Sequence, residues 1–294
     1  MTLREYLSER IDRVERALER WVPGEDVEPV TMHRAMRYSL FAGGKRVRPV
    51  LCLAAAEVID AGSTGVEDAA VTLEMIHTYS LIHDDLPALD NDDLRRGRPT
   101  NHKVFGEAMA ILAGDSLLTL AFEVLARLEG AGAERRVALV RELATASGTV
   151  GGMIGGQVHD MEGERQRPTA ELLERIHGAK TGALLRASVR MGAIYAGASA
   201  EDLAALTTYG EHAGLAFQIV DDVLDIEESS QALGKTAGKD VDQQKITFPA
   251  VYGLAESKRM AEDERKAAHA ALERFGPRAE RLREIADLIV DRKS

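Results

Sequence analysis

Cysteine is nearly absent from this chain of 294 residues, in which Cys52 is the single example. One cysteine can form neither an internal disulfide nor a cysteine-based zinc site. Aromatic residues are also scarce, at 4% of the sequence, although hydrophobic residues together make up 45%. An apolar content supplied mainly by small and aliphatic residues favours helices in a soluble protein.

Positive charge is also in short supply, with 37 Lys and Arg residues against 48 Asp and Glu residues and a net charge of −11. Nucleic acids and anionic membranes attract basic surfaces, so neither is an expected partner, although a local basic pocket is compatible with this balance. The N-terminal residues have no apolar signal-peptide core, and no uncharged segment is long enough to span a bilayer. We therefore expect a soluble, cytoplasmic protein.

Proline is sparse, and three long windows contain none of it, namely 50–86, 100–167 and 169–248. Strand-rich proteins show turn signals roughly every 8–12 residues, which these windows lack. Between Ala213 and Leu224 apolar residues recur at helical spacing. The sequence therefore predicts an all-α bundle of roughly ten helices, judged from typical helix lengths.

Acidic residues gather in two segments, each at the end of an apolar helical run. The first contains Asp84, Asp85, Asp90, Asp92 and Asp93, and the second contains Asp221, Asp222 and Asp225, which share one polar stripe of a helix with Gln218. Carboxylates on one stripe repel each other unless cations compensate them, and hard oxygen ligands suit Mg²⁺ together with substrate phosphates. A single motif of this kind is more often a solvated acidic face. Two motifs in one chain favour a metal and an anionic ligand.

The spacing of the first segment makes a structural prediction. Asp84 and Asp90 lie about 240° apart around a continuous helix, so their side chains would diverge. Pro87 between them can break the helix. We therefore expect the helix to end or distort between Asp85 and Pro87, which would return Asp90 toward the same metal.

Basic residues accompany each acidic segment. They are Lys45, Arg46 and Arg48 in GGKRVRP, Arg95, Arg96 and Arg98 in LRRGRP, Lys180 beside Thr181 between two glycines, and Lys235, Lys239 and Lys245 after the second segment. Arginine and lysine are natural ligands of diphosphates. Each alone is more often a surface charge, but the alternation of acidic and basic motifs predicts a diphosphate site. The glycines around Lys180 also predict a loosened helix that exposes a backbone carbonyl.

Taken together, these motifs resemble those of the trans-isoprenyl diphosphate synthases, specifically the short-chain farnesyl and geranylgeranyl diphosphate synthases. GGKRVRP, HTYSLIHDDLPALDNDDLRRGRPTNH, GGQVHD, KTGAL, FQIVDDVLD and GKTAGKD follow the family's order. The resemblance implies one isoprenoid synthase domain over residues 1–294, folded as a large helical bundle around a central cavity. It also implies a homodimer and a cluster of Mg²⁺ ions, three by analogy with the family.

The resemblance also implies individual roles. Lys45, Arg48, His77 and Arg96 would bind the diphosphate of isopentenyl diphosphate. Asp84, Asp90 and Asp221 would bind Mg²⁺, supported by Asp85 and Asp225. Arg95, Lys180, Lys235 and Lys245 would contact the allylic diphosphate, and Lys180, Thr181 and Gln218 would serve catalysis, the last two by stabilising the carbocation through their dipoles. Gln157 and Asp160 match a further motif whose role is less defined.

The implied reaction is a head-to-tail condensation of isopentenyl diphosphate with dimethylallyl or geranyl diphosphate. Ionising the allylic diphosphate requires neutralisation of a highly charged leaving group, which metals and lysines supply. The carbocation then needs a cavity that excludes water. The alkene attacks it, and loss of a proton completes the step.

Product length depends on the helix that precedes Asp84. Tyr79 and Ser80 lie five and four residues earlier, about 6–7.5 Å along the helix axis. A bulky ring there would close the bottom of the pocket. An aromatic residue five positions before the aspartate motif resembles the pattern of bacterial farnesyl synthases. Other motifs, such as GKTAGKD, resemble geranylgeranyl synthases of the plastid type. We expect a farnesyl product, with geranylgeranyl as the alternative.

Other classes of protein also deserve consideration. A terpene cyclase ionises diphosphates on a similar fold, but it has no need of Lys45 and Arg48 for a second diphosphate. A non-catalytic partner subunit of a prenyl synthase usually lacks one aspartate motif, whereas both are intact here. A metal phosphohydrolase, prompted by His83 and Asp84, would require further histidine–aspartate ligands.

Overall fold

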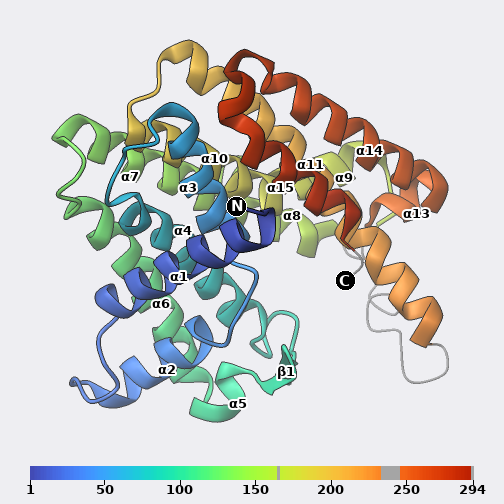
Figure 1. Cartoon of the computed structure of the whole chain (residues 1–294). Helices are drawn as coiled ribbons and strands as arrows, with labels where there is room; N and C mark the ends of the chain where they lie inside the picture. Colours follow the sequence, from blue (N-terminus) through green and yellow to red (C-terminus); the bar gives the residue numbers. More distant parts are fainter. Residues whose placement is uncertain (164–165, 233–245, 293–294) are drawn as a thin grey trace. The chain divides into compact units, whose positions relative to one another are not determined.

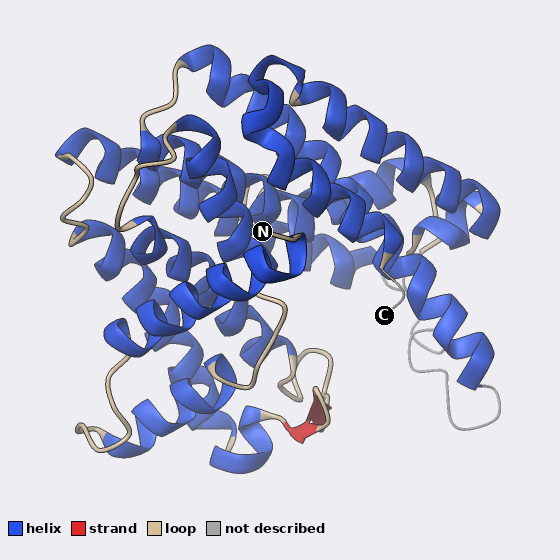
Figure 2. Ribbon diagram, viewed as in Figure 1, coloured by secondary structure: helices blue, strands red, loops and turns tan. Residues whose placement is uncertain are grey.

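The computed structural model describes residues 1–163, 166–232 and 246–292, and nearly all of its regular structure is helical (Figures 1 and 2). The helices are α1 (Leu3–Trp21), α2 (Val30–Leu40), α3 (Val47–Ile59), α4 (Val66–Asp84), α5 (Asn101–Phe105), α6 (Glu107–Ala126), α7 (Ala133–Ser147), α8 (Met153–Gly163), α9 (Ala170–His177), α10 (Ala183–Ala196), α11 (Ala200–Ala232), α13 (Phe248–Tyr252), α14 (Leu254–Ala271) and α15 (Glu280–Asp291). The all-α prediction is confirmed. Several helices are shorter than expected, so the described residues form more of them than predicted.

A small antiparallel hairpin, absent from the predictions, follows the first aspartate motif. Its strands are β1 (Leu94–Arg95) and β2 (Arg98–Pro99), with Leu94 opposite Pro99 and Arg95 opposite Arg98. The turn residues Arg96 and Gly97 both have positive φ, of 54° and 72°. This is the requirement of the tight two-residue turns that connect hairpins. The turn therefore places Arg96 at the tip of the hairpin.

The chain divides into two compact units, one formed by Met1–Leu53 with Gly62–Val140 and the other by Ala54–Ala61 with Arg141–Ser294. In the first unit, α4 packs against α6, and Leu73, Met75 and Ile76 of α4 are fully buried. α4 buries residues on almost every side, because helices cover it all around. That the whole chain acts as one domain stays a prediction.

In the second unit, α11 is the central helix and packs against α10 and α14. Ile219 and Val223 of α11 contribute to a buried cluster with Ile176 and Phe248. The hydroxyl of Tyr209 donates to the carbonyl oxygen of Leu282 at 2.7 Å, which ties α11 to α15. Burial of these side chains supplies the main stabilisation of the unit.

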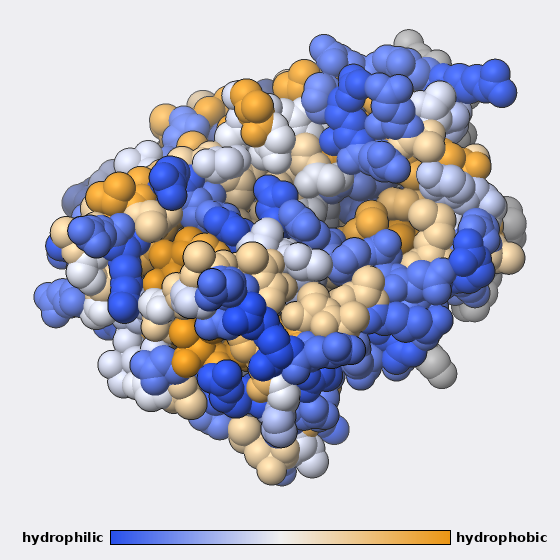
Figure 3. All heavy atoms as spheres, turned by 90° about the horizontal axis from the view of Figure 1, so that it is seen from above, coloured by the Kyte–Doolittle hydropathy of each residue, from blue (hydrophilic) through white to orange (hydrophobic). Residues whose placement is uncertain are grey.

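Of the described helices, α6 is long and apolar enough, by length and composition, to cross a membrane. Only 39% of its most apolar window is buried within the structure. Core helices of soluble proteins pass the same test, so one such helix is weak support for a membrane span. On the face shown in Figure 3, hydrophilic side chains predominate and hydrophobic ones gather in small patches.

Candidate active site

The first aspartate motif sits where α4 ends. The helix terminates at Asp84, and Asp85 caps it. Beyond Pro87 the chain folds back, so that the backbone amide of Asp90 donates to the carbonyl oxygen of Asp84 at 2.8 Å. The predicted break and return are therefore confirmed for the backbone. Asp84 and Asp90 both keep partly exposed side chains at this turn.

Asp85 differs from Asp84 because its side chain is only 3% exposed. Arg95 donates to the Asp85 carboxylate from Nε and Nη2, at 2.8 and 2.7 Å. Burial raises the pKa of Asp85, and the ion pair with Arg95 opposes that rise. Asp85 therefore orders the first strand of the hairpin by holding Arg95.

The loop between α2 and α3 carries the first basic motif. Gly43 and Gly44 have φ values of 84° and 148°, which favour glycine, and Arg46 also lies in the left-handed region at 47°. A Cβ atom on Gly44 would lie 2.5 Å from Nη1 of Arg96. The loop and the tip of the hairpin thus meet where only a glycine fits. Lys45 is exposed in this loop.

His77 lies on α4 among these basic groups. Burial lowers its pKa well below the ordinary value, and the positive charges of Arg48 and Arg96 lower it further. His77 is therefore neutral at pH 7 and can act as a hydrogen-bonding group without adding charge. Arg48 and Arg96 therefore lie close enough to His77 to influence its charge.

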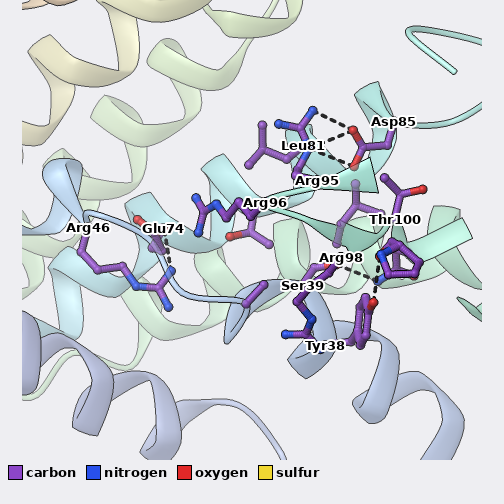
Figure 4. A pocket seen from close by; sticks show the side chains of 15 residues that line it. Tyr38, Ser39, Arg46, Glu74, Leu81, Asp85, Arg95, Arg96, Arg98 and Thr100 are labelled. Atoms are coloured by element: carbon purple, nitrogen blue, oxygen red, sulfur yellow. Dashed lines mark hydrogen bonds and ion pairs between the residues drawn. The ribbon is translucent and has the colours of Figure 1, made fainter. Parts of the chain in front are cut away.

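A small cavity of about 40 Å³ lies beside the hairpin in the first unit (Figure 4). Its charged lining residues are Arg46, Arg95, Arg96 and Arg98, with Glu74 and Asp85. Four guanidinium groups outnumber two carboxylates, so this part of the molecule favours an anion. The negative net charge of the chain does not extend to this pocket.

The second aspartate motif lies within α11, which continues through it without a break. Asp221 is partly exposed and accepts a hydrogen bond from Nη2 of Arg292 at 2.5 Å, and Asp225 is exposed. Asp222 is only 5% exposed. It shares a face of α11 with Gln218, as the predicted polar stripe requires, but the backbone at Phe248 covers it.

Asp222 instead binds groups from its own unit. It accepts a hydrogen bond from the backbone amide of Phe248 at 2.9 Å and another from Nε2 of Gln218 at 2.7 Å. His177 lies 3.6 Å away and donates from Nε2 to the carbonyl oxygen of Ile246 at 3.1 Å. Burial raises the pKa of Asp222 to about 7, since neutral donors stabilise its charge only in part.

Lys180 and Thr181 lie in a π-helical turn, Gly178–Gly182. This confirms the loosened backbone that the glycines predict. Nζ of Lys180 donates to Asp160 at 2.5 Å, which identifies a partner for the otherwise undefined GGQVHD motif. Gly156 of the same motif lies against the backbone of Lys180, where a Cβ atom would collide.

The structure describes some of the remaining predicted residues. Ser80 donates to the carbonyl oxygen of His77 at 2.9 Å. Lys235 and Lys245 lie outside the described residues. Over the described ranges, no three acidic, histidine or cysteine side chains converge into a ready-made metal site. Mg²⁺ typically uses one or two carboxylates plus substrate phosphates, so Asp84 with Asp90, and Asp221 with Asp225, are donor sets that fit it.

Sequence reasoning missed three groups that support these residues, namely Glu74, His177 and the anchoring role of Asp222. Glu74 and His77 are three residues apart and therefore share a face of α4. A carboxylate one turn before His77, in an otherwise apolar helix, is the sequence signal that could have identified Glu74. No comparable sequence signal marks His177.

The sequence model of the family described as polyprenyl synthetase matches residues 29–289 of this chain. The chain belongs to the polyprenyl synthetase family. Among its relatives, the chloroplastic geranylgeranyl pyrophosphate synthase 3 of Arabidopsis thaliana is 48% identical over 92% of this chain and 76% of the relative. A dimethylallyltranstransferase of Fischerella ambigua is 47% identical over 99% of this chain and 84% of the relative.

Solved structures with prenyl synthase or transferase activity in their descriptions have the same fold as this chain. An FPP/GFPP synthase from Zymomonas mobilis superposes with a TM-score of 0.86 at 35% identity and covers 98% of both chains. A geranyltransferase from Legionella pneumophila gives 0.85 at 36% identity and covers 98% of this chain and 97% of its own. The chain is thus a short-chain prenyltransferase with the all-α isoprenoid synthase fold, as the resemblance implied.

Proposed function

We propose that this prenyltransferase condenses isopentenyl diphosphate with dimethylallyl and then geranyl diphosphate, and releases farnesyl diphosphate. The proposed product length rests on the burial of Tyr79, a residue of α4 that is only 5% exposed. Its ring packs edge-on against His83 with a centroid distance of 5.7 Å. A ring held in this way limits the room for a prenyl tail beside α4. The pKa of Tyr79 is raised to about 12, so the phenol stays neutral.

Isopentenyl diphosphate is bound by the basic groups of the first unit in this proposal. Arg48, Arg96 and Lys45 supply the positive charge, and the neutral imidazole of His77 adds a hydrogen bond. The clustering of arginine charges around His77, seen in its lowered pKa, supports this role. An alkene held through its diphosphate needs no further activation, because it is itself the nucleophile.

The allylic diphosphate is bound by Arg95 and Lys180, together with Lys235 and Lys245. Asp84, Asp90, Asp221 and Asp225 hold Mg²⁺, and Asp85 keeps Arg95 in place. When bound, Mg²⁺ neutralises the charge that develops on the leaving diphosphate. The hydrogen bond between Lys180 and Asp160 supports the assignment, since it orients the ammonium group before substrate arrives.

The allylic cation is stabilised by fixed dipoles near Lys180. The π-helical turn leaves backbone carbonyl groups less constrained than in an α-helix, and the Thr181 hydroxyl lies in the same turn. Gln218 donates its amide hydrogen to Asp222, which fixes the orientation of the side-chain dipole. These groups act electrostatically and exchange no proton with the substrate.

A second candidate product is geranylgeranyl diphosphate. It is favoured by the names of relatives such as the heterodimeric geranylgeranyl pyrophosphate synthase large subunit 1 of Arabidopsis thaliana, 51% identical over 87% of this chain. The test is incubation with labelled isopentenyl diphosphate, each allylic starter and Mg²⁺, followed by chromatography. We expect a main product of fifteen carbons. A twenty-carbon main product would replace the farnesyl proposal, and no condensation would refute the activity itself.

A homodimer is part of the same proposal. α6 exposes Ile111 and Leu112, at 44% and 48%, and neighbouring Val104 is 47% exposed. Exposed large apolar side chains of this kind are typical of interfaces between copies of a chain. Sedimentation analysis of the wild type and of the Ile111→Glu variant tests it, with a dimer expected for the former and a monomer for the latter.

A further inference from the structure

Arg46 belongs to the first basic motif, yet its side chain points into the protein and is only 1% exposed. It donates from Nε to Glu15 of α1, from Nη1 to Glu74 of α4 and from Nη2 to the carbonyl oxygen of Leu40 in α2, each at 2.7 Å. One guanidinium therefore ties the loop between α2 and α3 to three helices. These contacts also explain why a non-glycine residue keeps a positive φ here.

Glu74 is the buried centre of this network, with 3% of the residue exposed. Burial lowers the pKa of Arg96, the charges of Arg46 and Arg95 lower it further, and the negative charge of Glu74 opposes this. Figure 4 shows the Arg96 side chain directed from the hairpin toward Glu74, which is joined to Arg46 by a dashed line. Glu74 is thus ion-paired with Arg46 and near enough to Arg96 to favour its charge, so it influences two arginines on separate loops.

We propose that Arg46 and Glu74 are positioning residues for the isopentenyl diphosphate site. Arg46 holds the loop that carries Lys45 and precedes Arg48, and Glu74 draws Arg96 to the same place. Without a carboxylate, the clustered guanidinium groups would repel each other whenever the diphosphate is absent. Because Glu74 is buried beneath them, it compensates this repulsion without competing for the ligand. The inference rests on the proposed function.

The first test is Glu74→Gln, which removes the charge and keeps the shape. We expect the KM for isopentenyl diphosphate to rise about tenfold or more, because the arginines lose their buried negative partner, while the KM for geranyl diphosphate stays within about twofold. Titration calorimetry with isopentenyl diphosphate alone, without Mg²⁺, measures binding apart from turnover. Glu67→Gln is the matched control, because Arg13 and Glu67 join the same helices, α1 and α4, at 2.8 Å. It should leave both KM values unchanged.

The second test separates positioning from folding. Arg46→Met combined with Glu74→Met leaves no lone buried charge, so its thermal stability should exceed that of either single variant. Binding of isopentenyl diphosphate should nevertheless stay weak. If binding recovers together with stability, the pair is only structural and the inference is wrong. A wild type that fails to condense substrates refutes the proposed function instead, and normal binding by Glu74→Gln in an active enzyme refutes the inference alone.

Discussion

The two aspartate motifs begin with the same pair of residues, but the chain uses them in different settings. In the first, α4 ends at Asp84 and the chain turns back. In the second, α11 runs on through Asp221 and Asp222. In both motifs the first aspartate is partly exposed while the second is buried. The first aspartate of each pair is therefore open to a ligand, and the second anchors neighbouring groups.

The anchors differ in what they hold. Asp85 faces the full positive charge of Arg95, whereas among the described residues Asp222 receives hydrogen bonds from the Phe248 amide and the Gln218 side chain, with His177 at 3.6 Å. Burial raises the pKa of both carboxyl groups, and that of Asp222 reaches about 7. Asp222, whose hydrogen-bond donors among the described residues are neutral, is therefore the anchor whose protonation changes near neutral pH.

The largest expected effect tests the division between ligand and anchor. Asp84→Asn should lower kcat about 10²–10³-fold, since it removes charge from the leaving-group site, with little change in Tm. Asp85→Asn should instead lower Tm by several degrees, because Arg95 loses a charged hydrogen-bond partner. Steady-state kinetics and thermal unfolding of both variants measure this. A larger loss of Tm in Asp84→Asn than in Asp85→Asn would contradict the comparison.

The next effect distinguishes the two anchors by pH. The pKa of Asp222 is raised in the folded protein, so the folded state binds an extra proton between the ordinary value of 3.8 and about 7, and stability falls as pH rises through that range. Asp222→Asn removes this dependence. Urea unfolding from pH 5 to pH 8 should show the variant gaining stability relative to the wild type as pH rises. A constant difference would show that Asp222 does not titrate there.

Tyr79→Ala tests whether α4, the helix of the first motif, sets product length. Removal of the ring should lengthen the main product by one isoprene unit, with total turnover within a few-fold of the wild type. Chromatography of the labelled products measures the change. Ser80→Ala tests the second residue predicted to affect product length, and we expect a smaller change because its hydroxyl is bonded to the backbone of its own helix. Unchanged product length in Tyr79→Ala would exclude this ring as the floor of the pocket.

The smallest expected effect concerns the second motif alone. Arg292 donates to Asp221 and stacks on Phe217 at 4.1 Å, so it competes with any cation for that carboxylate. Arg292→Gln should lower the Mg²⁺ concentration for half-maximal activity by about twofold, as expected for a partly exposed ion pair. Magnesium titration of activity measures this. An increased requirement would mean that Arg292 supports the site.

Much of the predicted site could be read from the sequence, because ligand chemistry restricts residue types. The roles of Asp84, Asp221, Arg48 and Lys180 stay predictions, whereas the end of α4 predicted from Pro87 is confirmed. The hairpin was missed because its strands contain two residues each, too few for a periodic pattern. Burial of Asp222 was missed because helical periodicity assigns it to the same face as its neighbours.

The sequence by itself determined the helical class, the order of the acidic and basic motifs and the kind of ligand, since local propensity and charge chemistry act over a few residues. Tertiary structure alone decided that Asp85 and Asp222 are buried anchors, that Glu74 pairs with Arg46 and that Asp160 holds Lys180. These contacts join segments 10 to 28 residues apart in the chain. The protonation and orientation of such groups depend on burial and on partners that only the folded chain supplies.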